Sequence, residues 1–227
     1  MDLLIIAFNK AISLLKYPIA FLFSFLILKF TIVLFAILLK MYQNPIIYKE
    51  FFMGMGIYIL SILLFKNRRG NWFFTIEHEL THVLFALLTF HKIIDFKASD
   101  RNGGHILFSG VGGGNWLITI SPYFFPTYSM IVIISIYFFE PRFYPFLVML
   151  LGYSMLYHIH STYYEISLNQ PDIKEAGIIF SFLFLPGANL LALIMILSAI
   201  PNDNIKFFVI VDNFYKYLYS LFHSFLY

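Results

Sequence analysis

Six apolar runs separated by short polar connections divide this chain of 227 residues. A helix needs about 20 apolar residues to cross a hydrocarbon core of about 30 Å, and most of the runs approach or reach that length. The runs are 19–39, 51–65, 72–90, 116–139, 143–166 and 177–200. Hydrophobic residues make up 60% of the chain and charged residues only 12%. We therefore expect an all-α, polytopic integral membrane protein with about six transmembrane helices, in a membrane that the sequence does not identify.

The segments outside these runs indicate a single domain covering residues 1–227. We expect residues 1–16 to form an interfacial helix or the entry to the first span, and residues 202–227 to form an interfacial aromatic tail. The positive-inside rule favours the cytoplasm for the basic loop at 66–71, but lysine and arginine are divided too evenly between alternate loops to settle the orientation. The net charge of +3 is spread along the chain, which predicts no nucleic-acid binding. Without cysteine, the chain has no disulfide, thiolate metal site or cysteine nucleophile.

Small residues and prolines predict details of helix packing inside the runs. Gly54 and Gly56 would permit close approach of a neighbouring helix. Pro122 and Pro126 interrupt the fourth run, and a proline removes a backbone hydrogen bond and kinks a helix. We expect this kink to open room near a buried site.

The run at 72–90 contains the sequence His78-Glu79-Leu80-Thr81-His82. His78 and His82 are four residues apart, so on a helix both imidazoles lie on one face and can bind one ion. Glu79 lies beside them and can act as a general base. Because ionisable groups in a membrane-length segment cost on the order of 3 kcal/mol, we interpret this H-E-x-x-H pattern as a catalytic Zn²⁺ site. The alternative is that the histidines only form hydrogen bonds with neighbouring helices.

A catalytic zinc ion usually has three protein ligands, so a third is needed. Asp172 is the first candidate, because a carboxylate after Pro171 at a helix start can point inward. The alternative for Asp172 is an ordinary carboxylate favoured by the helix dipole. His160 is the fallback ligand, followed by His158 and Glu165. We expect His91 and His105 to be polar loop residues rather than ligands.

Residues 91–115 form a polar interval rich in glycine, and residues 105–109 within it have the pattern of a short strand. An exposed strand edge is tolerated at membrane depth only if it is buried in protein or lines a wet cavity. We therefore expect a re-entrant strand or loop whose edge pairs with an extended substrate. Its predicted substrate-binding residues are His105, Ile106, Leu107 and Phe108. A glycine-rich loop without a substrate role is an equal alternative.

These residues together resemble the site-2 protease (M50) superfamily of intramembrane zinc metalloproteases, in its compact form without a PDZ domain. The resemblance covers about residues 72–189, and it implies that His78, His82 and Asp172 bind zinc and that Glu79 activates water. The family usually places its aspartate in a Leu-Asp-Gly context with an upstream Asn and Pro. Here Asn169 and Pro171 are present, but Ile173 follows the aspartate.

The predicted function is hydrolysis of peptide bonds in membrane-spanning substrates by a zinc-activated water. The expected partners are a transmembrane protein or peptide and the lipid bilayer. One alternative is a membrane metallopeptidase with Glu140 or Glu165 as third ligand, which acts on soluble or misfolded chains. Another is a non-catalytic membrane binding or regulatory protein. The predicted spans place His82 in mid-helix and Asp172 at the mouth of a span, so either residues 165–176 dip inward or one run is not a true crossing.

Overall fold

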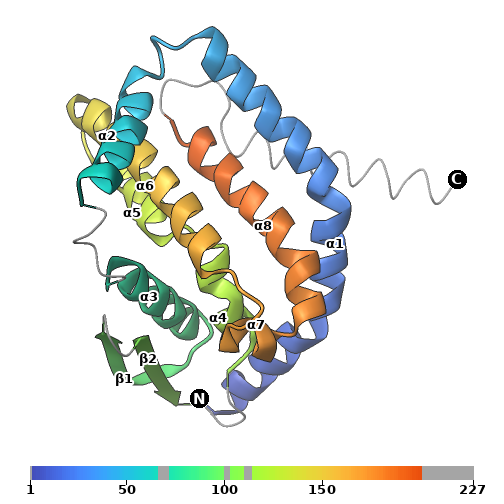
Figure 1. The fold of residues 1–227 in the computed structure, drawn as a ribbon. Coiled ribbons are helices and arrows are strands. Elements are labelled where there is room, and N and C mark those ends of the chain that lie inside the picture. The colour runs from blue at the N-terminus through green and yellow to red at the C-terminus, as the bar shows by residue number, and fades with distance from the viewer. Residues whose placement is uncertain (1, 66–71, 100–102, 110–113, 201–227) are drawn as a thin grey trace, which may run out of the picture.

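Two long helices, α1 (Asp2–Gln43) and α8 (Ile178–Ser198), run side by side in the computed structural model of the chain (Figure 1). The structure describes residues 2–65, 72–99, 103–109 and 114–200. The predicted basic loop at 66–71 and the predicted tail at 202–227 lie outside these residues, as does the glycine-rich stretch at 110–113.

The other elements follow the predicted order. They are α2 (Lys49–Phe65), α3 (Trp72–Leu88), β1 (Lys92–Ser99), β2 (Gly103–Ser109), α4 (Trp116–Ile120), α5 (Thr127–Phe138), α6 (Tyr144–Glu165) and α7 (Pro171–Ala176). Short 3-10 turns, η1 (Ser121–Tyr123) and η2 (Pro141–Phe143), precede α5 and α6. Helices α2, α3, α6 and α8 begin and end within two residues of the predicted runs. The chain is therefore mainly helical, as its apolar runs predict.

Two described helices are long and apolar enough to cross a membrane, namely α1 from Leu3 to Gln43, and α8. The segments Trp116–Tyr123 and Thr127–Phe138 give a third if this pair, bent by 84°, forms one broken span. The expectation of transmembrane helices is supported to this extent, and the count of six stays a prediction.

Helix α1 is long, and it is apolar both on the face buried in the bundle and on the opposite, exposed face. At 1.5 Å per residue its 42 residues extend over about 63 Å, roughly twice the thickness of a hydrocarbon core. The predicted segment 1–16 continues into the first span as helix from residue 2 onward. One face is buried in the bundle, and the opposite face carries exposed apolar side chains at helical spacing: Phe21, Phe25, Leu28, Ile32 and Phe35. An exposed apolar stripe of this length suits contact with lipid.

Helices α2 and α6 pack closely enough that their backbones touch. A Cβ atom at Gly54 would collide with the carbonyl oxygen of Met149, and one at Gly152 would collide with that of Phe51. A Cβ at Gly56 would meet nothing within 4 Å. The predicted close approach is therefore confirmed for Gly54 and not for Gly56.

The predicted kink in the fourth run separates α4 from α5. Asn115 caps α4, because its side chain accepts hydrogen bonds from the backbone N–H groups of residues 117 and 118. Pro122 and Pro126 then end helical hydrogen bonding, and the following helix α5 leaves at 84°. This run is thus bent rather than straight, and whether it crosses a membrane stays a prediction.

A two-stranded antiparallel sheet of β1 and β2 packs against α3 (Figure 1). Strand β2 contains the predicted strand 105–109, while its partner β1 was not expected. The register pairs Lys92 with Ser109 and Ser99 with Gly103, with an irregularity between Ile93 and Asp95. At the start of β1, the buried His91 contacts the Thr89 hydroxyl and the Asn9 amide. His91 is therefore a loop residue outside the candidate metal group, as predicted, and it lies in a buried polar cluster.

Candidate metal centre

His78 and His82 lie one turn apart on the same face of α3, as their spacing predicts. Their Nε2 atoms are 3.1 Å apart. Thr81, between them, is buried and its hydroxyl donates to the Glu77 carbonyl at 2.7 Å and contacts the Thr127 hydroxyl at the start of α5. Thr81 and Thr127 thereby fix the histidine-bearing turn of α3 against α5.

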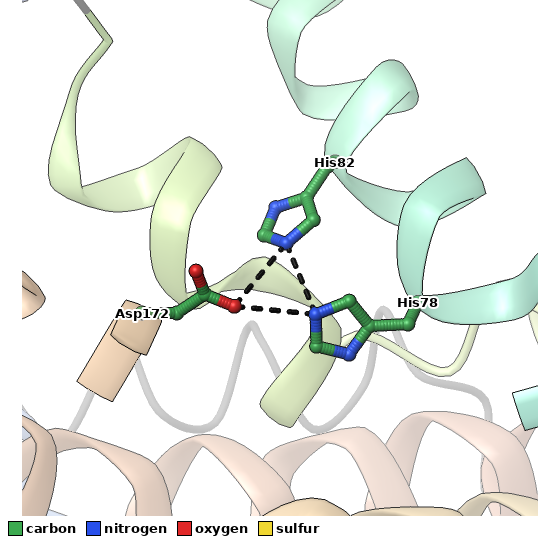
Figure 2. A group of neighbouring side chains, drawn as sticks. All are labelled: His78, His82 and Asp172. Atoms are coloured by element: carbon green, nitrogen blue, oxygen red, sulfur yellow. Dashed lines mark hydrogen bonds and ion pairs between the residues drawn. The ribbon is translucent and has the colours of Figure 1, made fainter. Parts of the chain in front are cut away.

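Asp172 brings a carboxylate oxygen to the two histidines from the first turn of α7 (Figure 2). Its Oδ2 atom is 3.2 Å from His78 Nε2 and 3.5 Å from His82 Nε2. With bonds of about 2.0–2.1 Å to zinc, neighbouring ligands of a tetrahedral site are separated by about 3.3–3.4 Å. The three separations, 3.1, 3.2 and 3.5 Å, lie close to that value. Among the described residues, His78, His82 and Asp172 form a group that could hold a metal ion.

The outer nitrogen of each imidazole contacts a group that only accepts hydrogen bonds. His78 Nδ1 is 3.1 Å from Glu165 Oε2, and His82 Nδ1 is 2.8 Å from the Ile118 carbonyl oxygen. Both Nδ1 atoms must then carry the proton, which leaves the Nε2 lone pairs facing Asp172 in the neutral tautomer. Three electron-rich atoms this close repel one another unless a cation or an extra proton lies between them. Ligand histidines in metalloproteins are oriented by such outer partners.

Pro122 explains why a backbone carbonyl is available to His82. In a continuous helix, the N–H of residue 122 would donate to the carbonyl of Ile118, but proline has no N–H. The Ile118 carbonyl instead accepts from Ser121, through its N–H and its hydroxyl, and from His82. The kink therefore contributes directly to the candidate centre.

Asp172 is held in place by the helices around it. The hydroxyl of the fully buried Tyr123 donates to Asp172 Oδ2 at 3.0 Å, and the Asn189 side chain donates to the Tyr123 carbonyl at 2.9 Å. The buried side chain of Ile173 anchors α7 in the core formed with α1, α4 and α8. Burial alone would raise the pKa of Asp172, but when the imidazoles carry an extra proton their hydrogen bonds to the carboxylate outweigh burial and hold this pKa below its ordinary range. This direction favours the ionised carboxylate, which is the form that binds a metal.

Glu79, the predicted general base, is buried on α3 next to His78. Its carboxylate lies within electrostatic reach of the Tyr123 hydroxyl, which bonds Asp172. Glu79 is thus close to the three-residue group without belonging to it. This position suits a carboxylate that exchanges protons beside a metal rather than one that binds it.

The other candidate ligands lie elsewhere or act differently. His160, the fallback ligand, bonds the Tyr58 hydroxyl through Nδ1 at 2.7 Å, and His158 is buried beside Thr162. Glu140 is exposed and pairs with a neighbouring arginine. Glu165 reaches the centre, but at the outer nitrogen of His78. Asp172 is therefore the carboxylate that the fold brings to both Nε2 atoms.

The predicted substrate-binding residues His105, Ile106, Leu107 and Phe108 all lie on β2. In the register they pair with Lys97, Phe96, Asp95 and Ile93 of β1. The side chain of Leu107 is exposed. Both strands contact α3, so the hairpin lies beside the helix that carries the histidines. Its role in substrate binding stays a prediction.

Sequence reasoning missed three participants, namely Tyr123, the Ile118 carbonyl and the Thr81–Thr127 contact. One of them had a signal in the sequence, since Pro122 frees a carbonyl four residues earlier. Tyr123 and Thr127 flank the same proline-rich break, and their orientation depends on its 84° bend. The bend angle cannot be derived from the residues alone.

The donor set of two imidazoles and one carboxylate suits Zn²⁺, and it also suits Fe²⁺. Comparisons of the chain with protein-family models, with curated proteins and with solved structures find no match. Inference about what this centre does therefore depends on its own residues and geometry.

Proposed function

We propose that this chain is an intramembrane zinc metalloprotease that hydrolyses peptide bonds of membrane-spanning substrates. The observation that carries the proposal is the convergence of His78, His82 and Asp172, with both outer imidazole nitrogens already engaged. The buried Glu79 beside them is the second support, because a purely structural zinc site needs no carboxylate between its histidines.

The proposed reaction divides between the metal and the protein. Zn²⁺ in this centre would supply Lewis-acid chemistry, polarising the substrate carbonyl and lowering the pKa of water. Glu79 takes a proton from water as the water oxygen bonds to the carbonyl carbon, and it then delivers that proton to the amide nitrogen as the C–N bond breaks. Glu165 and the Ile118 carbonyl keep the imidazoles oriented throughout.

The proposal includes a multi-pass arrangement of about six crossings, with the lipid bilayer as the surrounding phase. Its supports are the two span-length helices and the apolar stripe on α1. In this arrangement the hairpin of β1 and β2 offers backbone hydrogen bonds to a substrate segment that has unwound beside α3. An unwound segment is required because a helical backbone does not expose its carbonyls to attack.

A cleavage assay in liposomes tests the proposal. Purified protein and a fluorescent single-span peptide are reconstituted together, and products are followed by mass spectrometry for wild type and Glu79→Gln. We expect the wild type to cut the peptide and Glu79→Gln to lose about 10²–10⁴-fold in rate, the range typical of a general base. Glu175→Gln makes the same chemical change at an exposed carboxylate on α7 and should retain the wild-type rate. Equal cleavage by wild type and Glu79→Gln, or none by either with zinc bound, would contradict the proposal.

A further inference from the structure

A cavity of about 480 Å³ lies between the first turns of α3 and the helices α5 and α6. Its volume is within the range of about 300–1,000 Å³ typical of ligand pockets. Residues that line the cavity include Phe74 from α3, Tyr128 and Val132 from α5, and Tyr153 and Tyr157 from α6. The ring centre of Tyr157 is 5.2 Å from that of Phe74 and 5.3 Å from that of Tyr128. We call this space the aromatic cavity.

The aromatic cavity and the candidate metal centre share helices α3 and α6. Phe74 precedes His78 by four residues, so Phe74, His78 and His82 form one stripe on the same face of α3. At 1.5 Å per residue, four residues rise about 6 Å, so the backbone of Phe74 is about that far along α3 from the backbone of His78. Helix α6 contributes to both places, with Tyr157 at the cavity and Glu165 at His78.

We propose that the aromatic cavity is a specificity pocket that receives a large apolar side chain of the peptide being cut; this inference rests on the proposed protease function. An extended chain advances about 3.3 Å per residue. A peptide bond held at the metal therefore places the side chain one or two residues away at the level of Phe74. The apolar wall of the cavity selects phenylalanine or leucine over alanine at that position.

A buried hydroxyl at the cavity wall favours a peptide over a lipid acyl chain as the occupant. The Tyr157 hydroxyl is buried at the wall, close to the buried Glu77 carboxyl group on α3, but the two make no hydrogen bond of good geometry. Even when Tyr157 donates to Glu77, its oxygen still lacks a donor within the described part of the chain. Burying polar atoms without partners is costly, and the backbone of a bound peptide supplies partners that an acyl chain lacks.

Val132→Trp tests the inference because it fills the cavity. Ile131→Trp is the matched control, since it places the same ring on the exposed side of the same helix. The first readout is affinity, measured by fluorescence anisotropy, for single-span peptides that differ only by Phe, Leu or Ala at one position. It uses the Glu79→Gln background, where no cleavage occurs. The second readout is the cleavage rate of the same peptides by chains that keep Glu79.

We expect a preference of at least about tenfold for Phe over Ala at one position near the cleaved bond, as burial of the extra apolar surface implies. Val132→Trp should abolish this preference and Ile131→Trp should keep it. Tyr157→Phe removes only a hydroxyl, so it preserves the fold, and it should weaken binding of all the peptides by about threefold to tenfold. Metal content of one ion per chain in each variant shows that the fold is intact.

The possible failures are distinguishable. Glu79-dependent cleavage with the same side-chain preference in wild type and Val132→Trp overturns the pocket and leaves the protease proposal intact. Peptide binding that depends on Val132 without any cleavage overturns the protease function. If neither Val132→Trp nor Tyr157→Phe changes peptide affinity, the cavity does not hold the peptide, and a lipid chain becomes its occupant.

Discussion

Replacing Glu165 tests whether this residue binds the metal or only orients His78 through a hydrogen bond. Glu165 Oε2 accepts from His78 Nδ1 at 3.1 Å, and its side chain is only 15% exposed. A hydrogen bond to a charged group contributes about 1.5–3 kcal/mol and one between neutral groups about 0.5–1.5 kcal/mol. Glu165→Gln keeps an acceptor but loses the charge, so it should cost about 1–1.5 kcal/mol, or roughly tenfold in zinc affinity. Glu165→Ala loses both the acceptor and the charge, so it should lower zinc affinity by up to about 100-fold.

The assay is a competition for zinc between detergent-purified protein, stripped of metal, and a coloured chelator of known affinity. Glu140→Gln is the matched control, because it removes an exposed carboxylate that pairs with Arg142 at 3.0 Å on the surface. Its zinc affinity should equal that of the wild type. Complete loss of binding in Glu165→Ala together with retention in Asp172→Ala would refute the reasoning and make Glu165 the third ligand. Wild-type affinity in both Glu165 variants would also refute it.

Three further predictions concern the surrounding helices. Gly54→Ala should lower the free energy of unfolding by about 1–3 kcal/mol in SDS titrations of mixed micelles, because the added carbon collides with Met149, whereas Gly56→Ala should be nearly neutral. Asn115→Ala should cost about 1 kcal/mol in the same titration through loss of the α4 cap, and an unchanged midpoint would contradict the assignment of that cap. His160→Ala should bind zinc with wild-type affinity, since its imidazole contacts Tyr58 rather than the centre; a loss of metal would show that His160 is a ligand.

The positions of most helices were predictable because polar connections divide the chain clearly into apolar runs. Apolar runs between polar connections located α2, α3, α6 and α8 to within two residues of their ends. The break between α4 and α5 followed from Pro122 and Pro126. Which runs cross a membrane was less accessible, because crossing depends on tilt and neighbours as well as on length. The partner strand β1 was missed because Lys92, Asp95 and Lys97 make its sequence appear to be a polar loop.

The candidate centre was predictable where spacing determines geometry and not elsewhere. The four-residue spacing of His78 and His82 fixes their relation on any helix. Asp172 was found by chemical type, as an aspartate at a helix start, but its alignment with both Nε2 atoms depends on how α7 packs against α4 and α8. The role of Tyr123 arises from the same tertiary packing, and no local pattern announces it.

Metal content per chain tests the central claim most directly. Elemental analysis of protein purified with zinc and iron both available should give about one zinc ion per wild-type chain, and almost none in Asp172→Ala. Asp172→Ala must elute as a folded monodisperse species for the comparison to count. A wild-type chain without metal, or an Asp172→Ala chain that keeps its zinc, would contradict the assignment of His78, His82 and Asp172 as one metal centre.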